Sequence, residues 1–95
     1  MEKKVNLDKL IEKYIELSEL QGKYLSNGEV RKNNITAKKL RKVAVTLRNN
    51  KDYAEYAFPI IMKSGIYNVR TLGAVDALRT KLPSLEAEAI KVLEE

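Results

Sequence analysis

Apolar residues recur every three or four positions along nearly the whole chain, which is the period of an α-helix and not of a β-strand. The pattern is strongest over residues 6–26. Seven residues there share one side of the predicted helix: Leu7, Leu10, Tyr14, Leu17, Gln21, Tyr24 and Leu25. Asn6 has the side chain of a helix N-cap, and Val5 with Leu10 has the spacing of a hydrophobic staple. Because Asn27-Gly28 then supplies residues that end a helix, we predict an amphipathic helix over residues 6–26.

A second helix is predicted over residues 29–49. Its buried side would carry four apolar residues: Leu40, Val43, Ala44 and Leu47. Asn33 lies two turns before Leu40 on the same side, and two interpretations of it stay open. Either Asn33 belongs to a frayed first turn, or it is a buried amide that bonds main-chain groups of a neighbouring helix, since an unpaired buried polar group is costly.

The third predicted helix covers residues 53–63, after a break at residues 49–51. Asp52 and Glu55 have the spacing of a capping box at its start. Pro59 falls in the interior of this helix, where a proline removes one hydrogen bond and clashes with the preceding turn. We therefore expect the helix to kink or split near Phe58.

Two further helices complete the pattern. The fourth is predicted over residues 69–81, and Ser84 has the side chain of an N-cap for a short fifth helix after Leu82-Pro83. The similar triplets at 46–48 and 77–79 are 31 residues apart, a spacing that suits repeated helical pairs. We predict a single all-α domain over residues 1–95 with about five helices. In it a leading helix and two helical hairpins would form a right-handed α-α superhelix of the HEAT or armadillo type.

The amino-acid composition limits the chemical functions that the chain can have. The chain contains no cysteine and no histidine, which excludes disulfides, thiolate chemistry and the commonest metal ligand and general base. No glycine-rich phosphate loop follows a predicted strand. We therefore expect no enzymatic activity, no metal and no cofactor.

The longest apolar run, residues 57–62, is far shorter than the roughly 20 residues that span a bilayer. The charged N-terminus does not resemble a signal peptide, so we expect a cytoplasmic protein without membrane association.

The net charge of +5 is concentrated in one segment. Residues 1–28 are neutral and residues 52–95 carry a net charge of −2, whereas residues 29–51 contain eight basic residues and one acidic residue, a net charge of +7. The basic side chains are Arg31, Lys32, Lys38, Lys39, Arg41, Lys42, Arg48 and Lys51. They spread over roughly 200° of the helix surface at about 100° per residue. This surface is either a binding face for phosphates or for an acidic protein, or simply a solvated face.

A distinctive segment begins at Asn68-Val69-Arg70 and continues one turn later with the small residues Gly73 and Ala74. Together with the leading helix, the second helix and residues 58–62, it resembles a small uncharacterised bacterial family of domains of unknown function with HEAT-like folds. Related folds bind proteins or nucleic acids, and some small ones are immunity proteins that neutralise toxins. The resemblance implies that Arg70 ties adjacent repeats together, which would be a structural role.

These features favour a non-enzymatic module that binds a protein with an acidic surface, such as an inhibitor or an immunity or antitoxin-like factor. The alternative is sequence-independent binding of nucleic acid, because the helix after the basic one lacks side chains that read bases. The candidate partner-binding residues are Arg31, Lys38, Arg41, Lys42, Arg48, Tyr53 and Tyr67.

Four other residues are assigned structural roles: Asn33, Pro59, Arg70 and Asp76. Asp76 and Arg79 lie near the packing side of the fourth helix, and we expect a structural ion pair of these residues with Arg70 or with a neighbouring turn. Tyr56 is expected to pack in the core.

Overall fold

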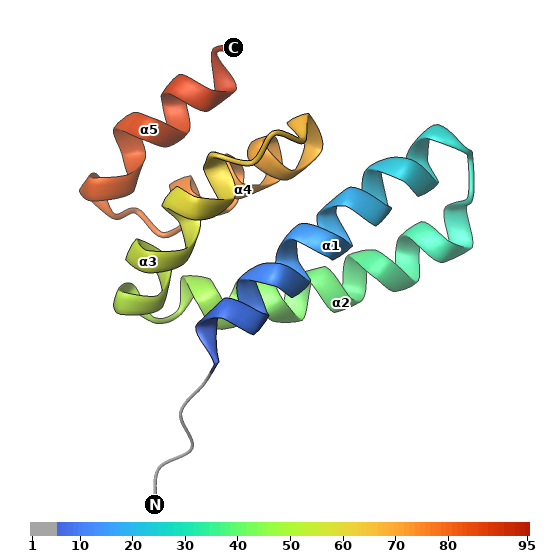
Figure 1. Cartoon of the computed structure of the whole chain (residues 1–95), viewed down its shortest axis with the longest axis horizontal. Coiled ribbons are helices and arrows are strands. Elements are labelled where there is room, and N and C mark those ends of the chain that lie inside the picture. Colours follow the sequence, from blue (N-terminus) through green and yellow to red (C-terminus); the bar gives the residue numbers. More distant parts are fainter. Residues whose placement is uncertain (1–5) are drawn as a thin grey trace, which may run out of the picture.

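The computed structural model describes residues 6–95, which contain five α-helices and no strand (Figure 1). The helices are α1 (Leu7–Ser26), α2 (Val30–Arg48), α3 (Lys51–Met62), α4 (Tyr67–Arg79) and α5 (Pro83–Leu93). The predicted all-α class and the number of helices are confirmed for this part of the chain. Val5, one half of the predicted hydrophobic staple, lies outside the described residues.

Helices α1 and α2 form an antiparallel hairpin and pack along most of their length (Figure 1). Asn6 caps α1 as predicted, because its side-chain oxygen accepts a hydrogen bond from the backbone N–H of Lys9 at 3.1 Å. At the turn, Gly28 has a φ of 71°, a left-handed conformation that glycine adopts without steric cost. Asn27 stays right-handed with a φ of −91°, so only the glycine of the predicted pair reverses the chain.

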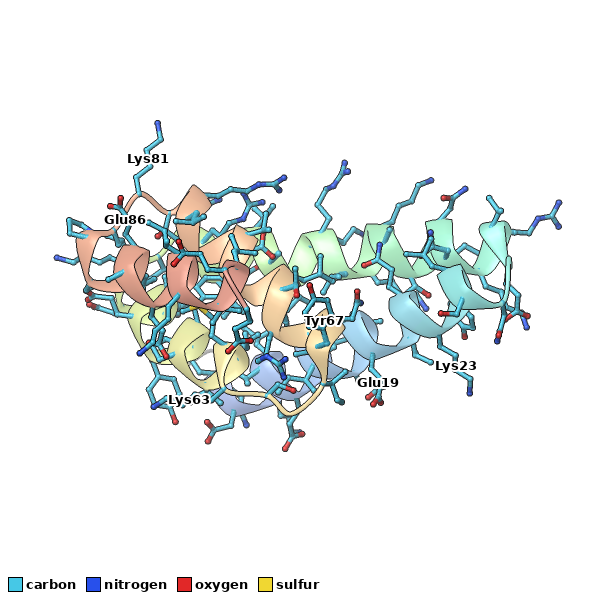
Figure 2. All side chains as sticks on the ribbon, turned by 90° about the horizontal axis from the view of Figure 1, so that it is seen from above. Glu19, Lys23, Lys63, Tyr67, Lys81 and Glu86 are labelled. Carbon is cyan, nitrogen blue, oxygen red and sulfur yellow. The ribbon has the colours of Figure 1, made fainter. Side chains whose placement is uncertain are left out.

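Helices α3, α4 and α5 pack against one another at one end of this hairpin, and the other end extends beyond them as an arm (residues 23–35) (Figures 1 and 2). No residue of the arm is buried. Lys23 projects from the α1 side of the arm, away from α2 (Figure 2). The arm is therefore a two-helix projection from a five-helix globule.

The core lies where α1 and α2 meet the other three helices. Leu40, Val43, Ala44 and Leu47 are buried as predicted. Small residues let α3 and α4 approach closely: a Cβ atom built on Gly73 would lie 2.5 Å from the Cγ2 atom of Ile61. Because real Cβ atoms do not approach that closely, only glycine fits at position 73 without a shift of the helices.

Two predicted caps are wrong. Asn50 caps α3, since its side-chain oxygen accepts hydrogen bonds from the backbone N–H groups of Asp52 at 3.0 Å and Tyr53 at 3.2 Å. Asp52 therefore lies inside the first turn, and the helix starts at Lys51. Helix α5 starts at Pro83, whose fixed φ suits the first helical position, and Ser84 instead donates its hydroxyl to Glu55 at 2.8 Å.

Helix α3 runs without a break from Lys51 to Met62, so of the kink or split expected near Phe58 the split does not occur. Phe58 and Ile61 on either side of the proline are fully buried, and this packing holds the helix together. Tyr56 is 49% exposed, which overturns its predicted core position. It lies roughly 200° around the helix from Phe58, on the outer side.

The start and end of α4 are each two residues earlier than predicted. The helix begins at Tyr67 and ends at Arg79. Lys81, expected to be its last residue, has a φ of 59°, a left-handed conformation that ends a helix.

We predict that Gly73→Ala destabilises the protein by about 1–3 kcal/mol, the usual cost of overpacking a core. The new methyl group must displace Ile61, which outweighs the gain in helix propensity. The free energy of unfolding measured in urea tests this expectation. Gly65→Ala is the matched control and should be nearly neutral, because nothing lies within 4 Å of a Cβ atom at that position. A Gly73→Ala variant as stable as the parent protein would contradict the close packing of α3 and α4.

Candidate functional site

The basic residues of α2 lie on different sides of the helix. Arg41 and Arg48 line a groove between α2 and α4, whereas Lys42 lines a separate groove between α1 and α2. Arg31 and Lys38 are exposed and line neither groove. The predicted basic residues of α2 therefore do not all line one groove.

The groove between α2 and α4 collects three arginines, and we call it the arginine groove. It has a volume of about 190 Å³. It is lined by Gln21 from α1, by Ala37, Leu40, Arg41, Ala44 and Arg48 from α2, and by Leu72, Val75, Asp76 and Arg79 from α4. Three positive side chains thus accompany one negative side chain on partly apolar walls.

Asp76 lies at the base of this groove and is only 8% exposed. Its Oδ2 atom accepts a hydrogen bond from the hydroxyl of Tyr14 at 2.5 Å. Its Oδ1 atom lies 3.6 Å from Nε of Arg48 and 3.9 Å from Nη1 of Arg79. The carboxylate therefore has partners on α1, α2 and α4. The expected structural ion pair is present, but with these two arginines and not with Arg70.

Tyr14 is fully buried, and its ring meets that of Phe58 edge to face with centroids 6.2 Å apart. Burial raises the pKa of the Tyr14 hydroxyl far above its ordinary range, and the negative charge of Asp76 raises this pKa further. The hydroxyl consequently keeps its proton and acts as a permanent hydrogen-bond donor to Asp76.

A second polar contact joins α4 to α1. Asn68 donates a hydrogen bond from Nδ2 to the backbone oxygen of Ser18 at 2.7 Å. A Cβ atom on the neighbouring Gly22 would lie 3.0 Å from that nitrogen, so glycine provides the space for Asn68. The role considered for Asn33, a side-chain amide that bonds the main chain of a neighbouring helix, is thus filled by Asn68.

Three buried side-chain atoms have no hydrogen-bond partner in the described part of the chain: Oε1 of Gln21, Oδ1 of Asn33 and Nε of Arg48. Gln21 and Arg48 line the arginine groove. The ion pair of Arg48 with Asp76, at 3.6 Å, is too long for a hydrogen bond. Because buried polar atoms are normally paired, the groove has unused capacity for hydrogen bonds.

The groove between α1 and α2 has a different character. It is wider, with a volume of about 900 Å³, and Leu10, Leu17 and Val43 contribute its apolar surface. Its charged residues have both signs: Lys9, Glu12, Lys13, Glu16, Lys39 and Lys42. Four lysines and two glutamates also leave this groove net positive, but a lysine ammonium lacks the planar fork with which an arginine guanidinium pairs with a carboxylate.

The two candidate tyrosines lie apart from the arginine groove. Tyr53 is half-buried against the core. Tyr67 is 63% exposed on α4, and its ring centroid lies 5.6 Å from the Arg70 guanidinium carbon. Neither tyrosine lines the groove, so the structure does not join them to the basic residues of α2.

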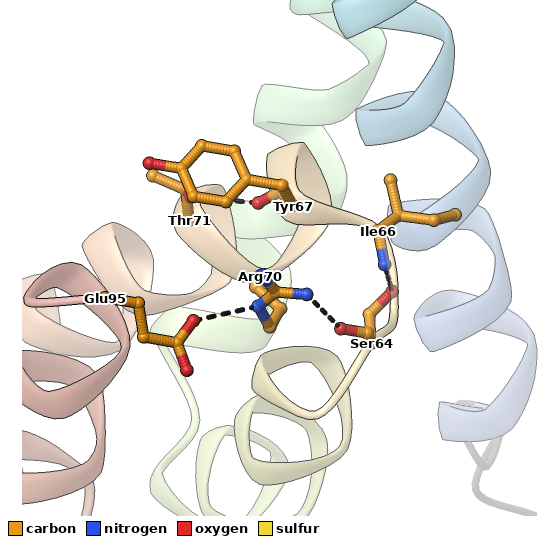
Figure 3. Close-up of polar contacts among 6 residues, drawn as sticks. All are labelled: Ser64, Ile66, Tyr67, Arg70, Thr71 and Glu95. Atoms are coloured by element: carbon orange, nitrogen blue, oxygen red, sulfur yellow. Dashed lines mark hydrogen bonds and ion pairs between the residues drawn. The ribbon is translucent and has the colours of Figure 1, made fainter.

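Arg70 joins three parts of the C-terminal half (Figure 3). Its Nη1 atom donates to the backbone oxygen of Ser64 at 3.0 Å, in the turn between α3 and α4. Its Nε atom donates to the carboxylate of Glu95, beyond α5, at 3.2 Å. These contacts are of the kind expected for a structural arginine.

The described residues contain no group of three or more potential metal-binding side chains among histidine, cysteine, aspartate and glutamate. Across residues 6–95, no helix has the length and apolar character needed to cross a membrane.

Comparisons with protein-family models, curated proteins and solved structures gave no match.

Sequence reasoning placed Arg79 with Asp76 on the packing side of the fourth helix, but it did not connect Tyr14 and Gln21 with them. Both residues carried a signal, because they are polar-tipped residues on the apolar side of α1, and such residues find polar partners when buried. The partner of Tyr14 is Asp76 on α4, 62 residues away, and the Oε1 atom of Gln21 has no hydrogen-bond partner, so helical periodicity could not connect either residue with the groove.

We predict that Tyr14 does not ionise in the folded protein. A raised folded pKa stabilises the protein below the unfolded value of about 10, and this contribution is lost as pH rises above it. In an alkaline titration followed by tyrosinate absorbance, one of the five tyrosines should therefore ionise only as the protein unfolds. The Tyr14→Phe variant should lack this step. A smooth titration of all tyrosines before unfolding would contradict the buried hydrogen bond.

We predict that Arg70→Ala lowers the melting temperature, because it removes both the Ser64 and the Glu95 contacts. Partner affinity measured well below melting should change little, since Arg70 lies outside the arginine groove. Glu95→Gln is the control for the ion pair alone and should have the smaller effect. A large loss of affinity at an unchanged melting temperature would make Arg70 a binding residue.

Proposed function

We propose that this chain is a non-enzymatic module that binds another protein through an acidic surface. Inhibitors and immunity or antitoxin-like factors are the kinds of protein that this proposal covers. The observation that carries it is the convergence of Arg41, Arg48 and Arg79 on one groove with partly apolar walls. Arginine is favoured at protein interfaces because its planar guanidinium pairs with carboxylates in a fixed geometry.

The overall arrangement proposed for this module is a right-handed, HEAT-like α-α superhelix. Its support is that each helix packs beside the next one in the chain, beginning with the α1–α2 hairpin. The sequence pattern around Arg70 and the link that this arginine makes between α4 and its neighbours agree with the resemblance to HEAT-like domains.

The positive charge of residues 29–51 favours an acidic protein as the partner, because it attracts such a protein to α2. Residues 29–51 carry a net charge of +7, and attraction of this kind raises the rate of encounter with an acidic surface at low salt. Nucleic acid is the competing partner, since phosphates respond to the same charge. The arginine groove favours protein because Leu72 and Val75 offer apolar contact beside the arginines.

Titration of fluorescently labelled duplex and single-stranded DNA at two salt concentrations separates these partners. We expect only non-specific affinity, with Kd of about 10⁻⁴–10⁻⁶ M at physiological salt. Capture of lysate proteins on the immobilised chain, followed by calorimetry with each purified acidic candidate, should then identify a tighter partner. Sub-micromolar DNA binding that ignores sequence at physiological salt would overturn the proposal.

A further inference from the structure

We propose that the arginine groove binds a carboxylate side chain presented by an extended acidic peptide segment of the partner protein. This inference rests on the proposed function and adds the site and the chemistry of recognition. The ligand class is a peptide in which an aspartate or glutamate lies next to an apolar residue.

The charges of the groove select an anion. Arg41, Arg48 and Arg79 contribute three positive charges, Asp76 contributes one negative charge, and the buried Tyr14 hydroxyl stays neutral. Arg41 forms no ion pair with any described residue, and Arg79 is 3.9 Å from Asp76, near the limit of such a pair. Both arginines are exposed, so their guanidinium groups are free to turn toward an incoming carboxylate.

The unpaired atoms narrow the choice of anion. Nε of Arg48 and Oε1 of Gln21 are buried without partners, so a ligand reaches them only when these side chains turn toward the groove; a carboxylate oxygen then satisfies the donor, and a hydrogen-bond donor satisfies the acceptor. An extended peptide carries both groups, a side-chain carboxylate and a main-chain N–H. A DNA backbone offers phosphate oxygens but no hydrogen-bond donor, so it satisfies only the arginine.

The size and walls of the groove agree with this ligand. A volume of about 190 Å³ accommodates side chains but not a helix or a duplex. Leu40, Leu72 and Val75 supply apolar surface beside the arginines, which an apolar neighbour of the acidic residue would cover. Water would then be excluded from the guanidinium–carboxylate contact, which strengthens it.

The test uses a short capped peptide with two glutamates between leucines, and a counterpart with glutamine in place of glutamate. Nitrogen-15-labelled full-length protein is titrated with each peptide to millimolar concentration while the arginine Nε–H and glutamine amide signals are recorded. With the glutamate peptide, the signals of Arg48 and Gln21 should shift and saturate together. The Arg70 signal is the internal control and should stay in place, because its guanidinium already bonds Ser64 and Glu95.

Two neighbouring variants locate the site. Arg41→Gln and Lys42→Gln each remove one positive charge from an exposed position of α2, but only Arg41 lines the arginine groove. We expect Arg41→Gln to weaken binding of the glutamate peptide at least about tenfold, as for loss of one charged hydrogen bond of about 1.4 kcal/mol or more. Lys42→Gln should weaken it less than about twofold. Circular dichroism and melting temperature check that both variants fold.

Four results of these titrations would contradict the proposal, and each would overturn part of it or reassign the groove. Equal losses for the two variants would overturn the groove site and leave the proposed function with a diffuse basic face. Equal binding of the glutamine peptide would overturn carboxylate recognition. No saturable shift with the glutamate peptide at millimolar concentration would also overturn the site, while the protein partner identified by capture would still decide the proposed function. Displacement of the peptide by a short DNA duplex, lost in Arg41→Gln, would reassign the groove to nucleic acid.

Discussion

The burial of Asp76 is the constraint on which the arrangement of the helices depends. A carboxylate taken out of water is costly unless it is paired and hydrogen-bonded. Here Tyr14 donates from α1, Arg48 lies beside it on α2, and Arg79 approaches from one turn further along α4. The partners are available together only when α4 crosses the hairpin at this point. Such a network contributes more to the choice of a single docking geometry than to net stability.

The docking geometry also creates the candidate site. Asn68 and Gly22 fix the N-terminal end of α4 on α1, and Asp76 fixes its C-terminal end between α1 and α2. The space left between α2 and α4 is the arginine groove. Arg48 therefore belongs both to the scaffold and to the groove, and its Nε atom is buried beside Asp76 without a hydrogen bond. Arg48 thus takes part both in the packing of the helices and in the proposed binding site.

Periodicity and charge predicted much of this molecule, but they describe one helix at a time. The apolar stripe of α2 correctly placed Leu40, Val43, Ala44 and Leu47 in the core, and Gly28 marked the turn. The caps of α3 and α5 were missed because Asn50 and Pro83 competed with equally plausible cap residues nearby. The basic residues of α2 were correctly assigned to that helix. Their division between two grooves depends on where α1 and α4 cross it, and no local pattern contains that information.

The central claim is that the hydrogen bond between Tyr14 and Asp76 couples the α1–α2 hairpin to the other three helices. A double-mutant cycle of Tyr14→Phe and Asp76→Ala, with unfolding free energies measured in urea, tests this claim most directly. Contacting residues in one network have coupling energies of about 0.5–3 kcal/mol. We predict a coupling of about 1 kcal/mol or more, such that the double variant is more stable than the sum of the single losses implies. Strictly additive losses would contradict the account.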